Sequence, residues 1–109
     1  MAEKHDLLVS KFRGYLSNQG CKIIKKGPFV DYRPDIFAMK GDNKIFVEAE
    51  LNQTLYSDHT LDQLTKMYEY LRKSKKYHGI LVIPKKYVSE AILLIESVFG
   101  DNKIRVKGN

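Results

Sequence analysis

The sequence predicts an α/β domain in which helices flank a central mixed β-sheet. Apolar residues at helical spacing alternate along the chain with short strand patterns, which is typical of this class. Residues 78–83 are almost continuously apolar and end at Pro84, as expected of an internal strand that helices cover on both faces. The chain has 109 residues, the size of one small domain, so we expect residues 1–109 to form a single unit.

The first predicted element is an amphipathic helix over residues 3–19. Leu8, Phe12 and Leu16 recur on one face at helical spacing, and Gly20 follows as a stop signal. This helix should pack its apolar face on the sheet.

Three strand patterns follow the helix. Residues 21–26 predict a short strand that closes before a Gly-Pro pair. Residues 35–39 and residues 44–50 lie on either side of the turn-prone segment 40–43. These two strands therefore predict a β-hairpin.

The second half of the chain alternates between helices and strands. A helix is expected over residues 60–76, because Thr60 and Gln63 have the spacing of a capping box and an apolar helical stripe follows them. The apolar strand at 78–83 comes next. The last elements are a helix over 88–99, stopped by Gly100, and a half-exposed strand around 104–106, which gives the order αβββαβαβ.

The net charge of the chain indicates what kind of partner it binds. There are 19 basic and 13 acidic residues, a net charge of +6, which favours an anionic partner such as nucleic acid or an acidic membrane surface. No apolar run approaches the roughly 20 residues of a membrane span, and the start of the chain lacks a signal-peptide pattern. We therefore expect a cytoplasmic, intracellular protein without a membrane partner. The single Cys21 excludes an internal disulfide.

The charges are unevenly distributed. Residues 31–62 hold seven acidic and three basic side chains, whereas the segments before and after them are both basic. One interpretation is a chance acidic cluster on a solvated face. The other is that the basic segments bind a polyanion while the acidic segment binds a cation.

The predicted hairpin brings carboxylates together. If the chain turns at Gly41, paired positions sum to 83, so Asp35 lies opposite Glu48, and Glu50 shares their face. A shift of one residue would place a carboxylate among the aliphatic residues of the other face. That apolar face consists of Ile36, Ala38, Ile45, Val47, Ala49 and Leu51.

Like charges opposite each other destabilise a sheet. Three arrangements would offset the repulsion: a raised carboxyl pKa, a lysine from another element, or a divalent ion held by hard oxygen ligands. In a chain suited to a polyphosphate partner, Mg²⁺ or Mn²⁺ between these acids would support phosphodiester hydrolysis. The alternative is a hairpin face whose acids are merely solvated.

These residues resemble the PD-(D/E)XK nuclease superfamily. The resemblance consists of Pro34-Asp35 followed, thirteen positions after the aspartate, by Glu48-Ala49-Glu50, together with the expected order of elements. It implies a restriction-endonuclease-like fold in which Asp35 and Glu48 bind Mg²⁺ or Mn²⁺. It also implies an acid on the first helix, for which Glu3 is the best-placed candidate, with Asp6 behind it.

The sequence departs from the family pattern at Glu50, where the family has a lysine that orients or deprotonates the attacking water. Glu50 would then serve as a metal ligand or general base. Lys66 and Lys22 are candidates for a lysine recruited from another element. Gln63 and His59 are assigned supporting roles, while His5 and His78 are expected to be structural because the histidines share no ligand spacing.

Two further resemblances bear on activity. The strand triplet with a helical acid resembles archaeal Holliday-junction resolvases, which carry the lysine. Residues 48–54 and the tyrosine-rich helix after them resemble the nuclease-fold domain of plasmid replication-relaxation proteins, which implies DNA binding without a demonstrated cut.

The leading hypothesis is a Mg²⁺-dependent DNA endonuclease with Asp35, Glu48 and Glu50 as catalytic residues. Its alternatives are an inactive DNA-binding module of the same fold and a protein-interaction domain. A homodimer is expected, because a small chain offers little recognition surface and two-strand cleavage needs two sites. The residues expected to contact the DNA backbone, unless they only complement helix ends, are Lys66, Arg72, Lys73, Lys75, Lys76, Lys85 and Lys86.

Overall fold

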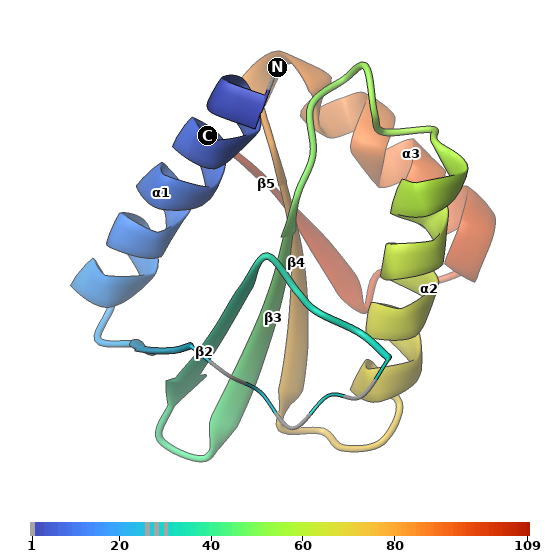
Figure 1. The fold of residues 1–109 in the computed structure, drawn as a ribbon. Helices are drawn as coiled ribbons and strands as arrows, with labels where there is room; N and C mark the ends of the chain where they lie inside the picture. Colours follow the sequence, from blue (N-terminus) through green and yellow to red (C-terminus); the bar gives the residue numbers. More distant parts are fainter. Residues whose placement is uncertain (1, 26, 28, 30) are drawn as a thin grey trace.

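The computed structural model describes residues 2–25, 27, 29 and 31–109, without the side chains of residues 2 and 3. Within these residues, no helix is both long and apolar enough to cross a membrane. The elements follow one another along the chain (Figure 1) as α1 (Ala2–Asn18), β1 (Lys22–Ile24), β2 (Ile36–Lys40), β3 (Asn43–Ala49), α2 (Asp58–Leu71), β4 (Tyr77–Ile83), the 3₁₀ turn η1 (Lys85–Tyr87), α3 (Val88–Phe99) and β5 (Ile104–Gly108).

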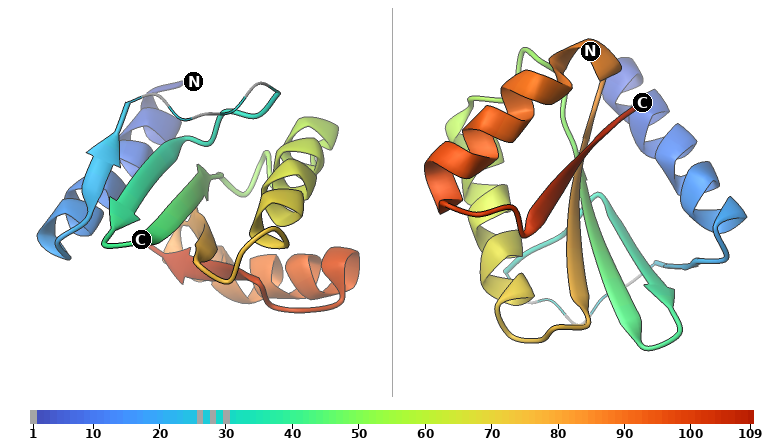
Figure 2. Two further views of the ribbon diagram at one scale, coloured as in Figure 1. Left: turned by 90° about the horizontal axis from the view of Figure 1, so that it is seen from below. Right: turned by 180° about the vertical axis from the view of Figure 1, so that it is seen from behind.

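The five strands form one mixed sheet in the order β1-β2-β3-β4-β5. Strands β1, β2 and β3 pair antiparallel, whereas β3, β4 and β5 pair parallel. Helix α1 lies on one side of the sheet, and α2 and α3 lie on the other (Figure 2). The predicted α/β class, with a mixed sheet between helices, is confirmed. The apolar strand β4 is internal, as its sequence predicts.

The two faces of the sheet bury different kinds of side chain. On the α1 side, Leu8, Phe12 and Leu16 pack on the aliphatic residues predicted to form the apolar hairpin face. On the other side, Phe37 and Phe46 pack with residues of α2 and α3 in an aromatic core. Both faces of the hairpin are therefore covered.

The hairpin register is the predicted one. Lys40 pairs with Asn43 and Ile36 with Val47, so paired positions sum to 83. The turn requires φ of +61° at Gly41, a left-handed conformation that glycine adopts without a steric cost. Asp35, which directly precedes β2, is thereby brought beside the end of β3.

Helix α2 differs from the prediction at both ends. Its N-cap is Ser57, whose hydroxyl accepts a hydrogen bond from the backbone N of Thr60 at 3.1 Å, so the predicted cap at Thr60 is wrong. The helix ends at Leu71 instead of near residues 75–76. The basic run that follows it forms a turn, in which the backbone N of Tyr77 donates to the carbonyl of Ser74.

Candidate metal centre

A cavity of about 1040 Å³ lies where β3 and β4 end and where α1 and α2 begin. The chain leaves β3 at the same end of the sheet as the start of α1 (Figure 1). Side chains from four separate segments line this cavity: the start of α1, the chain before β2, the end of β3 with the loop after it, and the start of α2. Its acidic and imidazole residues are His5, Asp35, Glu48, Glu50 and His59, together with Asp31.

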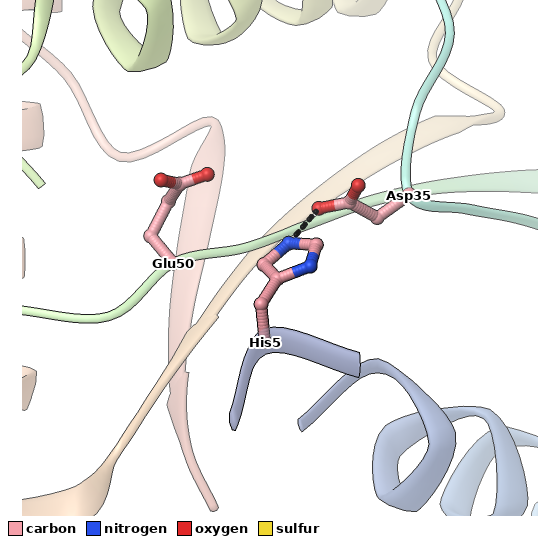
Figure 3. A group of neighbouring side chains, drawn as sticks. All are labelled: His5, Asp35 and Glu50. Carbon is pink, nitrogen blue, oxygen red and sulfur yellow. Dashed lines mark hydrogen bonds and ion pairs between the residues drawn. The ribbon is translucent and has the colours of Figure 1, made fainter. Parts of the chain in front are cut away.

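Three of these side chains converge at one place (Figure 3). The ligand atoms of His5, Asp35 and Glu50 all lie within 4.8 Å of one another, and all three residues are half-buried. His5 comes from α1, Asp35 precedes β2 and Glu50 follows β3. The predicted meeting of Asp35 and Glu50 is confirmed by this geometry, and His5 joins them from a third element.

Asp35 is held in place by two hydrogen bonds to the same oxygen. Its Oδ2 accepts from the backbone N of Ala49 at 2.8 Å and contacts Nε2 of His5 at 3.2 Å. The first bond ties the carboxylate to the end of β3. The second links it to the first helix, so that the aspartate is fixed from two directions.

Glu50 is fixed through its backbone and through its carboxylate. Its backbone N donates to the carbonyl of Val82 at 3.0 Å, which continues the pairing of β3 with β4. The hydroxyl of Thr60 lies 2.7 Å from its Oε1 and has the carbonyl of Thr54 as a second acceptor at the same distance. Thr60 is 1% exposed and belongs to the first turn of α2. The start of this helix therefore orients Glu50.

Glu48 occupies a different environment from the one predicted. Its side chain is only 4% exposed, and its Oε1 accepts a hydrogen bond from Tyr32 Oη at 3.1 Å. Burial, with the negative charge of Asp35, raises its pKa to about 9, and a hydrogen bond to the Asp35 carboxylate adds to the shift. Glu48 is thus a neutral acid beside the three converging residues. The alternative prediction, in which the acids of this hairpin face are only solvated, is wrong for Glu48, because its side chain is buried.

His5 interacts with the carboxylate of Asp35. Burial lowers its pKa, but the attraction of the Asp35 carboxylate and the hydrogen bond to it outweigh that effect and raise the pKa overall. Of the three arrangements expected to offset the repulsion, the structure shows the raised carboxyl pKa at Glu48. The side chain that reaches Asp35 from another element is a histidine, His5, instead of a lysine.

The other predicted residues divide into those that line the cavity and those that do not. Gln63 and His59 line it. Lys22 pairs with Met39 near the far end of β2, and Lys66 lies 3.3 Å from Asp62, so neither of these lysines is among the lining residues. The exposed cations Lys4 and Arg33 do line the cavity. The side chain of Glu3 lies outside the described residues, and Asp6 Oδ1 lies 3.8 Å from His5 Nδ1.

The predicted DNA-contacting residues are not gathered around the carboxylates. Arg72, Lys73, Lys75 and Lys76 are exposed in the turn before β4, at the opposite end of the sheet. Lys85 and Lys86 are exposed in η1, directly after β4 and so at the same end of the sheet as the carboxylates, but neither of them lines the cavity. Spacing along the chain does not show that the turn before β4 is far from the carboxylates, because this distance depends on the direction in which β4 runs.

The donor set of the three converging residues fits a divalent metal. Two carboxylates provide the hard oxygen ligands that Mg²⁺ and Mn²⁺ accept, and an imidazole adds a nitrogen donor that suits Mn²⁺ better than Mg²⁺. His5 and the carboxylates must be deprotonated to bind, so binding would release protons. Glu48 lies outside this cluster, as one of its neighbours.

Comparison of the chain with protein-family models, with curated proteins and with solved structures finds no match.

Proposed function

We propose that this chain is a metal-dependent DNA endonuclease with a restriction-endonuclease-like fold. The observation that carries the proposal is the convergence of His5, Asp35 and Glu50 within 4.8 Å in a large cavity at the edge of a mixed sheet. The order of a leading helix, an antiparallel strand triplet, a helix, a parallel strand and a helix supports the fold.

The converging residues have distinct roles in this proposal. Asp35 and Glu50 bind Mg²⁺ or Mn²⁺, and His5 is the third donor. The bound ion would polarise a phosphoryl oxygen and lower the pKa of a water. The backbone N of Ala49 and the hydroxyl of Thr60 hold the two carboxylates in place.

The predicted metal ligand Glu48 has a supporting role in this arrangement. Burial keeps it a neutral acid beside Asp35, and its orientation is fixed by the hydrogen bond from Tyr32. Loss of its proton on metal binding would add a further oxygen donor. Lys4 and Arg33 are the cations placed to contact the phosphates of the substrate in the cavity. A homodimer, which would supply two such sites to a duplex, stays a prediction.

The second candidate function is a DNA-binding module that does not cut. It is favoured by the environment of Glu48, since a carboxyl group with a pKa of about 9 gives up its proton reluctantly to a metal. It is also favoured by the glutamate at position 50, where the resembling family has a lysine. Binding and cutting must therefore be measured separately.

The test compares two aspartates of the same hairpin. Wild type, Asp35→Asn and Asp42→Asn are incubated with labelled duplex, single-stranded and branched DNA in Mg²⁺, in Mn²⁺ and in EDTA. Asp42 is the matched control, because it lies in the turn, is exposed and pairs with Lys76. Wild type and Asp42→Asn should cut in Mn²⁺ and not in EDTA. Asp35→Asn should lose at least about a hundredfold, since loss of a mere supporting contact to a ligand already costs 10- to 100-fold.

Two results would decide between the candidates. Equal cutting by Asp35→Asn and wild type contradicts the metal centre. Salt-sensitive DNA binding without cutting by any of the proteins supports the binding module. Titration calorimetry with Mn²⁺ alone adds a direct measurement, in which Asp35→Asn should bind more weakly than Asp42→Asn.

A further inference from the structure

A second cavity, of about 490 Å³, lies at the other end of the sheet from the carboxylates. It is formed where β4 begins and where β5 begins, and includes the end of the turn that precedes β4. The two cavities are separate, because they share no lining residue. The charged and imidazole residues of the second one are Lys75, His78, Lys103, Arg105 and Lys107.

The parallel pairing of β4 with β5 assembles this group. Ile80 pairs with Arg105 and Val82 with Lys107, which directs both cations to the same face of the sheet as these two aliphatic residues. The alternate residue Ile104 is 2% exposed and packs in the aromatic core on the opposite face. The strand thus presents a cation at every second position to the α1 side, where Lys107 Nζ lies 5.7 Å from the ring of Tyr15.

The charge of the cavity is uncompensated by the residues that line it. Its lining holds four full positive charges and, within the described part of the chain, no carboxylate. None of these four cations belongs to an ion pair formed by described residues. The neighbouring Asp101 accepts from the hydroxyl of Tyr68 and from the backbone N of Lys103, and among the described residues it forms no ion pair with these four cations.

We infer that this cavity binds phosphates of a nucleic-acid backbone. Like charges gathered in a concave site favour an anion that carries several charges, and Arg105 and Lys107 repeat at a spacing of about 6.6 Å along the strand. Arginine and lysine side chains together with a histidine are donors suited to phosphate oxygens. The inference rests on nucleic acid as the proposed partner but not on the proposed cleavage. It gives the chain an anchoring site whose residues are distinct from those of the metal centre.

This assignment differs from the one that the sequence suggests. Of the basic run before β4, only Lys75 lines the cavity. Lys76 contacts Asp42 at 3.3 Å and Lys73 lies over the ring of Tyr70 at 4.3 Å. The anchoring residues are instead supplied mainly by β5.

The experiment compares two double variants with the same change in charge. R105Q/K107Q removes the two cations of the strand, and K11Q/K40Q removes two exposed cations outside both cavities. Binding of fluorescein-labelled single-stranded and duplex DNA is followed by anisotropy at several salt concentrations, with Ca²⁺ in place of Mg²⁺ or Mn²⁺. R105Q/K107Q should weaken binding on the order of tenfold near 0.1 M salt. It should also reduce the slope of log K against log salt by about 1.4–1.8, which corresponds to two phosphate contacts.

Three outcomes would overturn this phosphate site. An equal loss in both double variants would mean that only net charge matters, and unchanged binding by R105Q/K107Q would exclude the site. A change in sedimentation of R105Q/K107Q would assign this surface to contact between two copies of the chain. If the wild-type protein binds no DNA, nucleic acid is also wrong as the partner. If it binds DNA through Arg105 and Lys107 but does not cut it, only the proposed cleavage is wrong.

A second measurement does not depend on the folding of a variant. Addition of a short single-stranded oligonucleotide to ¹⁵N-labelled wild-type protein should shift the amide signals of Lys75 and of residues 103–107. Shifts confined to residues around the carboxylate cavity would contradict the second site.

Discussion

The two ends of the sheet carry similar kinds of charged groups in opposite circumstances. Where β3 and β4 end, Glu48 is 4% exposed, accepts a hydrogen bond from Tyr32 and is repelled by the charge of Asp35. Where β4 begins, Lys76 pairs with Asp42 at 3.3 Å, and the two side chains are 62% and 84% exposed. One end holds an acid that burial keeps neutral, and the other holds an ordinary surface ion pair.

The two ends therefore differ in how strongly their charged groups affect the stability of the fold. Water screens the exposed pair, so its formation changes the stability of the fold very little. Burial of Glu48 instead shifts its pKa from 4.5 to about 9, which is a large difference between the free energies of its charged and neutral forms. A cation that enters the buried end can recover this free energy, because it favours the charged form. The exposed end can attract a charged ligand over a distance, but binding there recovers no free energy of burial.

The largest expected effect is on the pH dependence of stability. The pKa of Glu48 is higher in the folded chain than in the unfolded chain, so its stabilising contribution is complete below pH 4.5 and is lost as pH rises toward 9. In EDTA, wild-type stability should fall by on the order of 1 kcal/mol per pH unit over this window relative to Glu48→Gln. The glutamine keeps an acceptor for Tyr32 and a donor for Asp35.

Urea unfolding between pH 5 and 8.5 measures this effect. Glu69→Gln is the matched control, because Glu69 is exposed on α2. Its stability should follow the wild-type curve, whereas Glu48→Gln should become the most stable of the three proteins at high pH. Parallel curves for wild type and Glu48→Gln would mean that Glu48 is ionised in the native state, and the contrast between the two ends would disappear.

A second, smaller effect is expected from the tyrosines that donate to glutamates. Tyr32 donates to the buried Glu48, and Tyr56 donates to the exposed Glu90 at 2.7 Å. Tyr32→Phe should destabilise the fold by about 1–3 kcal/mol, since it leaves a buried acceptor unsatisfied. Tyr56→Phe should leave the unfolding midpoint unchanged, since water replaces the lost donor. Thermal and urea unfolding of both variants at pH 6 tests the pair, and equal losses would show that burial is not what distinguishes them.

The sequence contains enough information to predict the hairpin and the placement of Asp35. A turn at Gly41 and strict alternation on both strands determine the register, and a shift by one residue would place carboxylates in the aliphatic core. The sequence also indicates that Glu48 is buried, although the spacing of the carboxylates alone does not show it. Phe37 and Phe46 lie on the same hairpin face as Glu48, and two aromatic residues indicate a face that another layer covers.

The rest of the site depends on tertiary structure. His5 reaches Asp35 only because α1 crosses the sheet with its first turn beside the end of β3, and no local pattern encodes that approach. Tyr32 lies in an irregular segment without periodicity. Thr60 suggests a helix cap from its spacing, but Ser57 caps the helix, and the Thr60 hydroxyl is left to contact Glu50.

The smallest effect is expected at the surface pair of Lys76 and Asp42. A double-mutant cycle of Lys76→Gln and Asp42→Asn should give a coupling free energy below about 0.5 kcal/mol, because both side chains are mostly exposed. The coupling should decrease further in 0.5 M salt, whereas the difference between wild type and Glu48→Gln should persist because Glu48 is shielded from solvent ions. Urea unfolding of the four proteins of the cycle at both salt concentrations measures this. A coupling above about 1.5 kcal/mol would show that electrostatics also affect stability strongly at the exposed end, and the contrast between the two ends of the sheet would then lose its physical basis.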